Sequence, residues 1–209
     1  MIKLYGLPRS RSTRITWLLE ELGLDYEYIA LSPDQKGLKS PEYLAINPGG
    51  KVPTIVENGV ILTESGAITT YLADKHTDYE LIPSAGTTQR AHYDRWSYFA
   101  LCELEQPLWT IGKHTFVLPE KKRVPTVIPT AQWEFQHALK LLSEGLGDKP
   151  YILGDDFQAV DILLGHTLFW AMTFKQDIPQ ENLKAYAQRL QGREALQQAK
   201  AREETASKA

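Results

Sequence analysis

Two residues at a predicted helix start could bind an anion. A helical pattern runs from Glu64 to about Lys75 and puts Glu64 and Ser65 in its first turn. A helix amino terminus offers free N–H groups and partial positive charge, which bind a carboxylate well. Simple capping of the helix by Thr63 or Ser65 is the alternative reading. The two roles can coexist, because several N–H groups are free at one helix end.

A second motif, NPGGKVPTI at residues 47–55, places a proline at the head of a strand-like run. Proline has no N–H to donate, so it is confined to strand starts, edges or bulges. The conformation of the backbone at Val52 and Pro53 therefore matters more here than the regularity of the strand. The plain alternative is a turn that leads into a strand, with Lys51 in solvent.

The first 80 residues alternate between strand-like and helix-like segments. We expect strands at residues 2–5, 26–31, 52–56 and 60–63, and helices at about 15–22, 41–46 and 64–75. The helical crossover between the first two strands implies parallel pairing, and Asn58-Gly59 predicts an antiparallel hairpin between the last two. A four-stranded mixed sheet with three helices follows, which is a thioredoxin-like α/β arrangement.

The pattern changes after residues 78–88. Strand-like alternation stops, and long helical periods with an interruption at Pro107 extend to about residue 202. We therefore expect a thioredoxin-like domain at residues 1–80, a linker at 81–87 and an all-α domain at 88–209. The polar tail KAREETASKA, residues 200–209, is expected to fray.

Composition limits the function classes. The 209-residue chain has a formal net charge of −3, which is not typical of a nucleic-acid-binding protein. Its single cysteine, Cys102, cannot form an internal disulfide and suits a reducing compartment. The five histidines show no metal-ligand spacing. The longest apolar run, residues 160–174, is too short to span a bilayer, so we expect a cytoplasmic protein with no membrane or nucleic-acid partner.

Several stretches together resemble a known family. Residues 7–27 (LPRSRSTRITWLLEELGLDYE), 47–55 and 63–75 (TESGAITTYLADK) resemble the amino-terminal domain of the cytosolic glutathione transferases. Residues 151–168 (YILGDDFQAVDILLGHTL) resemble their helical domain. Within the family, the chain looks closest to the bacterial and fungal branch allied to the serine-type, theta-like enzymes.

The resemblance implies that both motifs above bind glutathione, a tripeptide thiol. It implies a cis peptide bond before Pro53, and pairing of the Val52 main chain with the cysteine of glutathione as one more short strand. Lys51 would reach the glycine carboxylate or the flank of the peptide. Ser65 would bind the γ-glutamyl carboxylate, and Glu64 would bind the ammonium group.

The resemblance also implies a serine that stabilises the glutathione thiolate. Serine-type members place it four residues ahead of an arginine, and Arg14 sets that register on Ser10. Ser12 competes for the role, Arg11 could stabilise the thiolate as a nearby cation, and Tyr5 is a rival that lies inside the expected first strand. The simplest alternative for Ser10 is an N-cap of the first helix.

One family contact is not matched in this chain. Some serine-type enzymes hold the glycine carboxylate with a histidine–lysine pair, and the corresponding residues here are Leu38 and Lys39. Only Lys39 is kept as an expected glutathione contact. No cysteine stands in the loop before the first helix, which disfavours cysteine-type glutathionyl exchange.

Aromatic residues of the helical half are expected to line a second-substrate pocket between the domains. Trp109, Phe116 and Trp170 are the residues that the resemblance favours, and ordinary core packing is the alternative for each. The charged run EKKR, residues 120–123, is expected to be a solvated loop.

These expectations combine into one function. We expect a homodimeric glutathione S-transferase that conjugates glutathione to small hydrophobic electrophiles in detoxification, with peroxide reduction as a further activity. Glutathione would be the co-substrate, with no other cofactor and no metal. The alternatives are a non-catalytic glutathione- or ligand-binding relative and a glutathione-dependent disulfide reductase.

Overall fold

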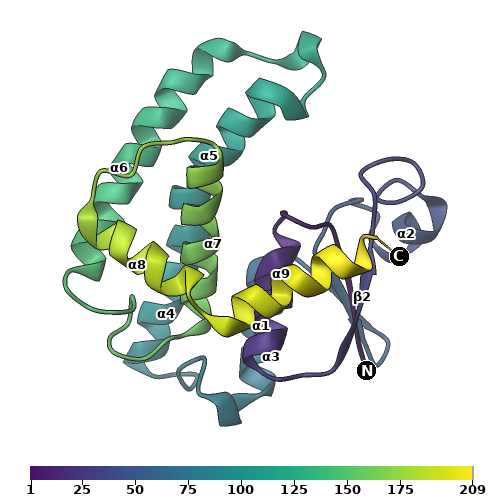
Figure 1. The fold of residues 1–209 in the computed structure, drawn as a ribbon, viewed down its shortest axis with the longest axis horizontal. Helices are drawn as coiled ribbons and strands as arrows, with labels where there is room; N and C mark the ends of the chain where they lie inside the picture. Colours follow the sequence, from purple (N-terminus) through teal and green to yellow (C-terminus); the bar gives the residue numbers. More distant parts are fainter. Residues whose placement is uncertain (209) are drawn as a thin grey trace. The chain divides into compact units, whose positions relative to one another are not determined.

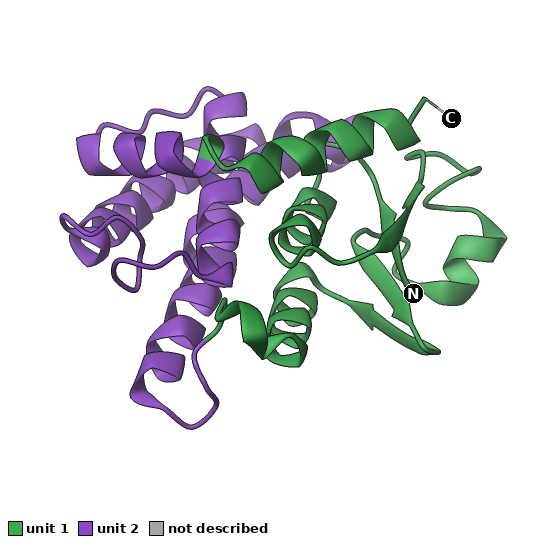
Figure 2. Ribbon diagram, turned by 60° about the horizontal axis from the view of Figure 1, so that its bottom comes forward, with its two compact units in different colours: residues 1–82, 191–209 green, residues 83–190 purple. Residues whose placement is uncertain are grey.

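The computed structural model describes residues 1–208 and contains two compact units (Figures 1 and 2). Unit 1, green in Figure 2, combines Met1–Ile82 with the chain from Gln191 onward. Unit 2, purple in the same view, spans Pro83–Leu190. Among the residues that the structure describes, no helix has the length and apolar character needed to cross a membrane.

Unit 1 is built on a four-stranded mixed sheet with the strand order β2-β1-β3-β4, which confirms the predicted fold class. Its strands are β1 (Ile2–Gly6), β2 (Tyr26–Ala30), β3 (Thr54–Glu57) and β4 (Val60–Thr63). β1 pairs in parallel with β2 and antiparallel with β3, and β4 is antiparallel to β3. Asn58 and Gly59 close the hairpin with positive φ angles of 49° and 82°, as a tight turn of this type requires.

Three helices follow the strands of unit 1, namely α1 (Ser12–Glu21), α2 (Pro41–Ile46) and α3 (Ser65–Lys75), with a 3₁₀ turn at Thr77–Tyr79. Gly23 lies just past α1 with a φ of 57°, the left-handed conformation that ends many helices. The side chain of Ser40 caps α2 by accepting a hydrogen bond from the N–H of Tyr43. Leu18 of α1 and Ile68 of α3 are fully buried in the core of this unit.

Unit 2 is helical, and its segments are α4 (Thr88–Phe99), the π-helix η2 (Ala100–Leu104), α5 (Glu105–Gly112), the π-helix η3 (Lys113–Val117), the 3₁₀ turns η4 (Glu120–Lys122) and η5 (Pro125–Val127), α6 (Ile128–Leu146), α7 (Ala159–Thr173) and α8 (Glu181–Gln191). The interruption expected at Pro107 lies one turn earlier, in η2. Proline lacks an N–H and clashes with the carbonyl four residues before it, so the distortion falls around Glu103.

The last helix, α9 (Glu194–Ala206), belongs with unit 1 rather than with the helical domain expected at 88–209. The expected fraying of residues 200–209 is also wrong for the helical part, because Leu196, Ala199 and Glu203 are buried on one face. Arg193, just before the helix, forms a two-point ion pair with Glu21 of α1, with Nη2 and Oε2 2.7 Å apart. Apolar burial and this ion pair hold the helix in place.

Candidate functional site

Three chain segments meet at one end of the sheet in unit 1. Tyr5 of β1 lies opposite Thr54 of β3, and Thr54 lies opposite Thr63 of β4, both in antiparallel register. The chain therefore leaves β1, enters β3 at Pro53 and leaves β4 at Glu64 at the same end of the sheet. The sheet register thus brings the three sequence motifs together.

Ser65 stands in the first turn of α3 and is joined to α1 by a buried arginine. The Nη1 atom of Arg14, a side chain with no exposed surface, donates a hydrogen bond of 3.1 Å to Ser65 Oγ. A guanidinium can only donate, so the Ser65 hydroxyl accepts this bond and keeps its own proton for another acceptor. Glu64, with an exposed side chain and a φ of 67°, precedes it. Sequence reasoning used Arg14 only to set the register of the loop and missed this contact.

The segment Lys51–Pro53 has a cis Val52–Pro53 peptide bond, as the resemblance predicts. Its Lys51 carbonyl accepts hydrogen bonds from Asn47 Nδ2 at 2.8 Å and from the Tyr43 hydroxyl. Burial raises the pKa of Tyr43, so its hydroxyl remains a donor near neutral pH. Within residues 1–208, the backbone of Val52 makes no hydrogen bond of its own. Side chains from α2 and the turn after it therefore support a short extended segment whose polar groups are available.

The two predicted lysine contacts lie at this same segment. Lys39 is exposed, and its Nζ atom lies 3.5 Å from the carbonyl oxygen of Gly50. Lys51 is also exposed. The structure thus places two cationic side chains beside the Val52 main chain, where they could meet an anionic group.

The loop before α1 holds both candidate serines. Ser10 Oγ donates to the carbonyl of Leu7 at 2.6 Å and accepts from the N–H of Ser12 at 3.1 Å. Ser12 Oγ accepts from the N–H of Leu7 at 3.2 Å, and Ser12 is fully buried. Ser10 and Arg11 are only half-buried. The buried Ser12 side chain therefore stabilises the loop, whereas the Ser10 side chain bonds the first turn of the helix and is partly exposed to solvent.

A buried carboxyl from the last helix lies beneath this loop. Glu203 accepts hydrogen bonds from Thr16 at 2.8 Å and Thr13 at 2.9 Å, and only 2% of its surface is exposed. Burial raises the pKa of Glu203 to about 7, although the hydrogen bonds from Thr16, Thr13 and the N–H of Arg9 act to lower it. Arg9 has a positive φ of 59° and stands next to Ser10. Sequence reasoning missed Glu203, although its spacing from Leu196 and Ala199 on one helix face was the available signal.

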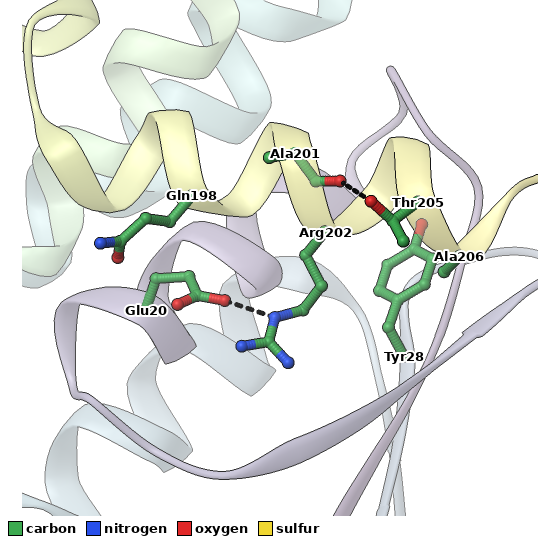
Figure 3. Close-up of a pocket in the computed structure, with 7 residues that line it drawn as sticks. All are labelled: Glu20, Tyr28, Gln198, Ala201, Arg202, Thr205 and Ala206. Carbon is green, nitrogen blue, oxygen red and sulfur yellow. Dashed lines mark hydrogen bonds and ion pairs between the residues drawn. The ribbon is translucent and has the colours of Figure 1, made fainter.

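A hollow of about 760 Å³ is lined by residues of α1, β2 and α9 (Figure 3). Its lining consists of Glu20, Tyr28, Gln198, Ala201, Arg202, Thr205 and Ala206. Arg202 Nε pairs with Glu20 Oε1 at 2.7 Å, so the cation at its wall is already matched by an anion (Figure 3). None of the sequence-predicted site residues lines this hollow.

The aromatic residues proposed for a second substrate form one cluster within unit 2. The ring centroids of Trp109 and Trp170 are 6.4 Å apart. Phe174 lies 5.4 Å from Trp170 and 5.6 Å from Phe116, so it joins the three predicted side chains. Sequence reasoning missed Phe174, which follows Trp170 at helical i+4 spacing. Phe116 is 58% exposed, whereas both tryptophans are half-buried.

No group of three or more histidine, cysteine or acidic side chains in residues 1–208 is arranged to hold a metal ion. The only cysteine, Cys102, is exposed and lies in unit 2.

Known proteins share both the sequence and the fold of this chain. The profile of the family "Glutathione S-transferase, N-terminal domain" matches residues 1–74. The disulfide-bond oxidoreductase YfcG of Escherichia coli K12 is 32% identical over 78% of this chain and 76% of its own length. Glutathione S-transferase GstA of Escherichia coli O157:H7 is 28% identical over 95% of this chain and 96% of its own length.

Two solved structures extend the likeness to three dimensions. A glutathione transferase from Methylococcus capsulatus superimposes with a TM-score of 0.88 at 28% identity, over 98% of this chain and all of its own. A sphingomonad glutathione S-transferase complexed with glutathione gives a TM-score of 0.84 at 26% identity, over 96% and 98% of the two chains. The chain therefore belongs to the glutathione S-transferase family and is an enzyme of that class. The serine-type branch stays a prediction.

Proposed function

We propose that this protein binds glutathione at this end of the sheet in unit 1 and transfers the glutathione thiolate to small hydrophobic electrophiles. One observation carries the proposal. The loop at Ser10, the segment at Val52 and the helix start at Ser65 converge at one end of the sheet. A glutathione-bound structural relative with 26% identity supports the choice of ligand.

The three segments match the parts of glutathione in order. The free backbone groups of Val52 suit the main chain of the cysteine, as in the addition of a short strand. The hydroxyl of Ser65 and the amino terminus of α3 suit the γ-glutamyl carboxylate. Glu64 suits the ammonium group beside that carboxylate, and Lys39 and Lys51 suit the glycine carboxylate. Each charge on the tripeptide thus meets a group of opposite character.

Ser10 then donates a hydrogen bond to the thiolate at the amino terminus of α1. A free thiol has a pKa near 8.5, so only about 3% of it is ionised at pH 7. Lowering that pKa by about 2 units needs about 2.7 kcal/mol in favour of the thiolate. A hydrogen bond to a charged group supplies about 1.5–3 kcal/mol, and a helix amino terminus adds about 0.3–1 kcal/mol. The half-buried hydroxyl of Ser10 is sufficient without a general base.

The transfer step balances with the groups present. The thiolate sulfur attacks the electrophilic carbon, a C–S bond forms, and the leaving group departs with its electron pair while the thiol proton has gone to solvent. We assign the aromatic cluster of Trp109, Trp170 and Phe116 to the electrophile, because such rings bind flat apolar molecules. Peroxide reduction, homodimer formation, a detoxification role, a cytoplasmic location and the lack of any further cofactor complete the proposal.

A second candidate function rests on one specific observation. The relative YfcG, which is 32% identical, is named a disulfide-bond oxidoreductase. A disulfide reductase would use the same bound glutathione thiolate to attack a sulfur atom rather than a carbon atom. A non-catalytic glutathione binder is the third possibility that the same experiment separates.

The test combines binding and turnover. Calorimetry with glutathione should show uptake, and a chlorinated nitroaromatic should be conjugated faster than hydroxyethyl disulfide is reduced. Ser10→Ala should lose conjugation while binding persists, and Ser84→Ala, an exposed serine in unit 2, serves as the matched control. Faster disulfide turnover favours the reductase, uptake without turnover favours the binder, and no uptake contradicts all three.

A further inference from the structure

One exposed segment of unit 2 has no part in the proposed reaction apart from Phe116. Residues 113–127, here called the α5–α6 tip, join α5 to α6 through η3, η4 and η5 and close the end of that helix pair in Figure 1. They include the charged run 120–123 that the sequence predicts to be a solvated loop. The sequence alone leads to the expectation of no membrane partner; from the exposed groups of this segment we propose instead that the α5–α6 tip is a peripheral docking surface for an anionic lipid bilayer.

The charge of the α5–α6 tip is opposite to that of the chain. It carries four cationic residues, Lys113, Lys121, Lys122 and Arg123, against the single acid Glu120, while the whole chain has a formal net charge of −3. Lys121 and Lys122 are exposed to solvent. Each lysine near an anionic membrane surface contributes about fivefold to affinity. The local excess of positive charge is what such a surface attracts.

Apolar side chains stand exposed within the same 15 residues. Val117 is 45% exposed, Val124 is 51% exposed and Phe116 is 58% exposed. Clustered exposed apolar groups next to polar ones mark interaction sites more often than isolated exposed residues do. A phosphate polymer such as RNA would neutralise the lysines but leave both valines in water. The interface of an anionic bilayer offers a partner to both kinds of side chain.

The α5–α6 tip is also held in a defined shape. Arg123 folds back, so that its Nε donates to the carbonyl of Leu118 at 2.8 Å and its Nη2 to that of Phe116 at 3.1 Å. The N–H of Val124 donates to Nδ1 of His114 at 3.0 Å. These bonds join the apolar turn to the basic run across the segment. A preorganised loop loses little conformational freedom on binding, which favours even a small contact surface.

The contact is peripheral and independent of glutathione. It inserts no helix, in keeping with the lack of a membrane-crossing helix in residues 1–208. The membrane contact depends on residues outside the glutathione site of unit 1, so a failure of the glutathione proposal would not contradict it. Its consequence for the enzyme is access to apolar electrophiles dissolved in the bilayer.

The experiment is co-sedimentation of the full chain with vesicles of phosphatidylcholine alone or with added phosphatidylglycerol. The wild-type protein should sediment only with the anionic vesicles, and high salt should release it. Lys121→Gln with Lys122→Gln should weaken binding about 25-fold, as two contributions of about fivefold multiply. Val117→Ser with Val124→Ser should also weaken it, since the apolar contact is lost.

The matched control is Lys140→Gln with Lys149→Gln, which removes the same charge from exposed positions elsewhere in unit 2. It should sediment as the wild type does, and thermal unfolding should show that all variants are folded. The proposal is overturned by equal sedimentation with neutral vesicles, by an equal loss in the control, or by no sedimentation. Binding of polyuridylate in place of vesicles assigns the α5–α6 tip to nucleic acid and overturns it as well.

Discussion

The hydroxyl oxygens of Ser10 and Ser12 lie 3.0 Å apart, yet the two side chains differ in what else they contact. Ser12 is fully buried and accepts the N–H of Leu7, whereas Ser10 is half-buried at the start of α1. The Ser10 hydroxyl donates to the Leu7 carbonyl at 2.6 Å. A bound thiolate, with its full charge, is the stronger acceptor, so the hydroxyl would turn toward it.

This relationship separates the two serines by kinetics. Ser10→Ala should lower kcat by about tenfold to 100-fold with little change in the KM for glutathione, because a charge-assisted hydrogen bond of about 1.5–3 kcal/mol is lost. Ser12→Ala should instead destabilise the fold by about 1 kcal/mol, since it removes the acceptor of the partly buried Leu7 N–H. Steady-state rates with a chlorinated nitroaromatic and denaturant unfolding measure both effects. A larger loss of kcat per folded enzyme in Ser12→Ala would reverse the assignment.

The segment at Val52 predicts a different kinetic signature. Tyr43→Phe removes a hydroxyl that binds the Lys51 carbonyl and lies 2.9 Å from Thr54 Oγ1. Glutathione affinity should fall about fivefold, while kcat stays near the wild-type value, because the hydrogen bond of about 1 kcal/mol that holds the Lys51 carbonyl in place is lost. Tyr71→Phe is the control, since its hydroxyl bonds Glu57 in the same unit. Equal losses in the two variants would show a general effect on stability instead.

Glu203 predicts how stability depends on pH. Its pKa rises on folding from 4.5 to about 7, so the folded protein holds the proton more tightly than the unfolded chain does. The stabilising contribution is therefore complete below pH 4.5 and is lost as the pH rises to about 7, with no further change above that value. The shift corresponds to a loss of about 3 kcal/mol across this range.

Glu203→Gln should remove that part of the pH dependence, because an amide does not titrate. Unfolding by denaturant at pH 5 and at pH 8 gives the difference for the wild type and for the variant. Glu204→Gln changes the exposed neighbouring acid and should keep the wild-type difference. If Glu203→Gln shows the same pH dependence as the wild type, the carboxyl is not buried in the folded state as described.

The aromatic cluster of unit 2 predicts an effect on the second substrate alone. Trp170→Leu should raise the KM for a flat aromatic electrophile several-fold, because the ring that contacts Trp109 and Phe174 is lost. Calorimetric affinity for glutathione should not change. Trp133→Leu is the matched control, since Trp133 is 68% exposed and outside the cluster. A loss of glutathione affinity in Trp170→Leu would point to disruption of the fold.

Much of the fold was open to sequence reasoning because its signals are local. The Asn58-Gly59 turn, the crossover between the first two strands and the long helical periods are all read from neighbours in the chain. The helix distortion lies in η2 rather than at Pro107, because the effect of a proline falls on the turn before it. The prediction of fraying fails for the helical part of residues 200–209, because the polar Glu203 gives no apolar signal although it is buried on the same face as Leu196 and Ala199.

Sequence patterns predict only those site residues that stand in a short local motif. Ser10, Val52 and Ser65 stand in short motifs that the sequence displays. The hydrogen bonds that hold these motifs in place join residues far apart in the sequence. Arg14 is 51 residues from Ser65, and Glu203 is 187 residues from Thr16. Nothing in a single sequence links such pairs, because their contact depends on how the helices pack.

The most direct test of the central claim is the pKa of the glutathione thiol in the binary complex, followed by the ultraviolet absorbance of the thiolate. With the wild-type protein, it should lie about 2 units below the free value of about 8.5. Ser10→Ala should bind glutathione and return that pKa to within about 1 unit of the free value, leaving only the effect of the helix amino terminus. An unchanged, low thiol pKa in Ser10→Ala would contradict the account.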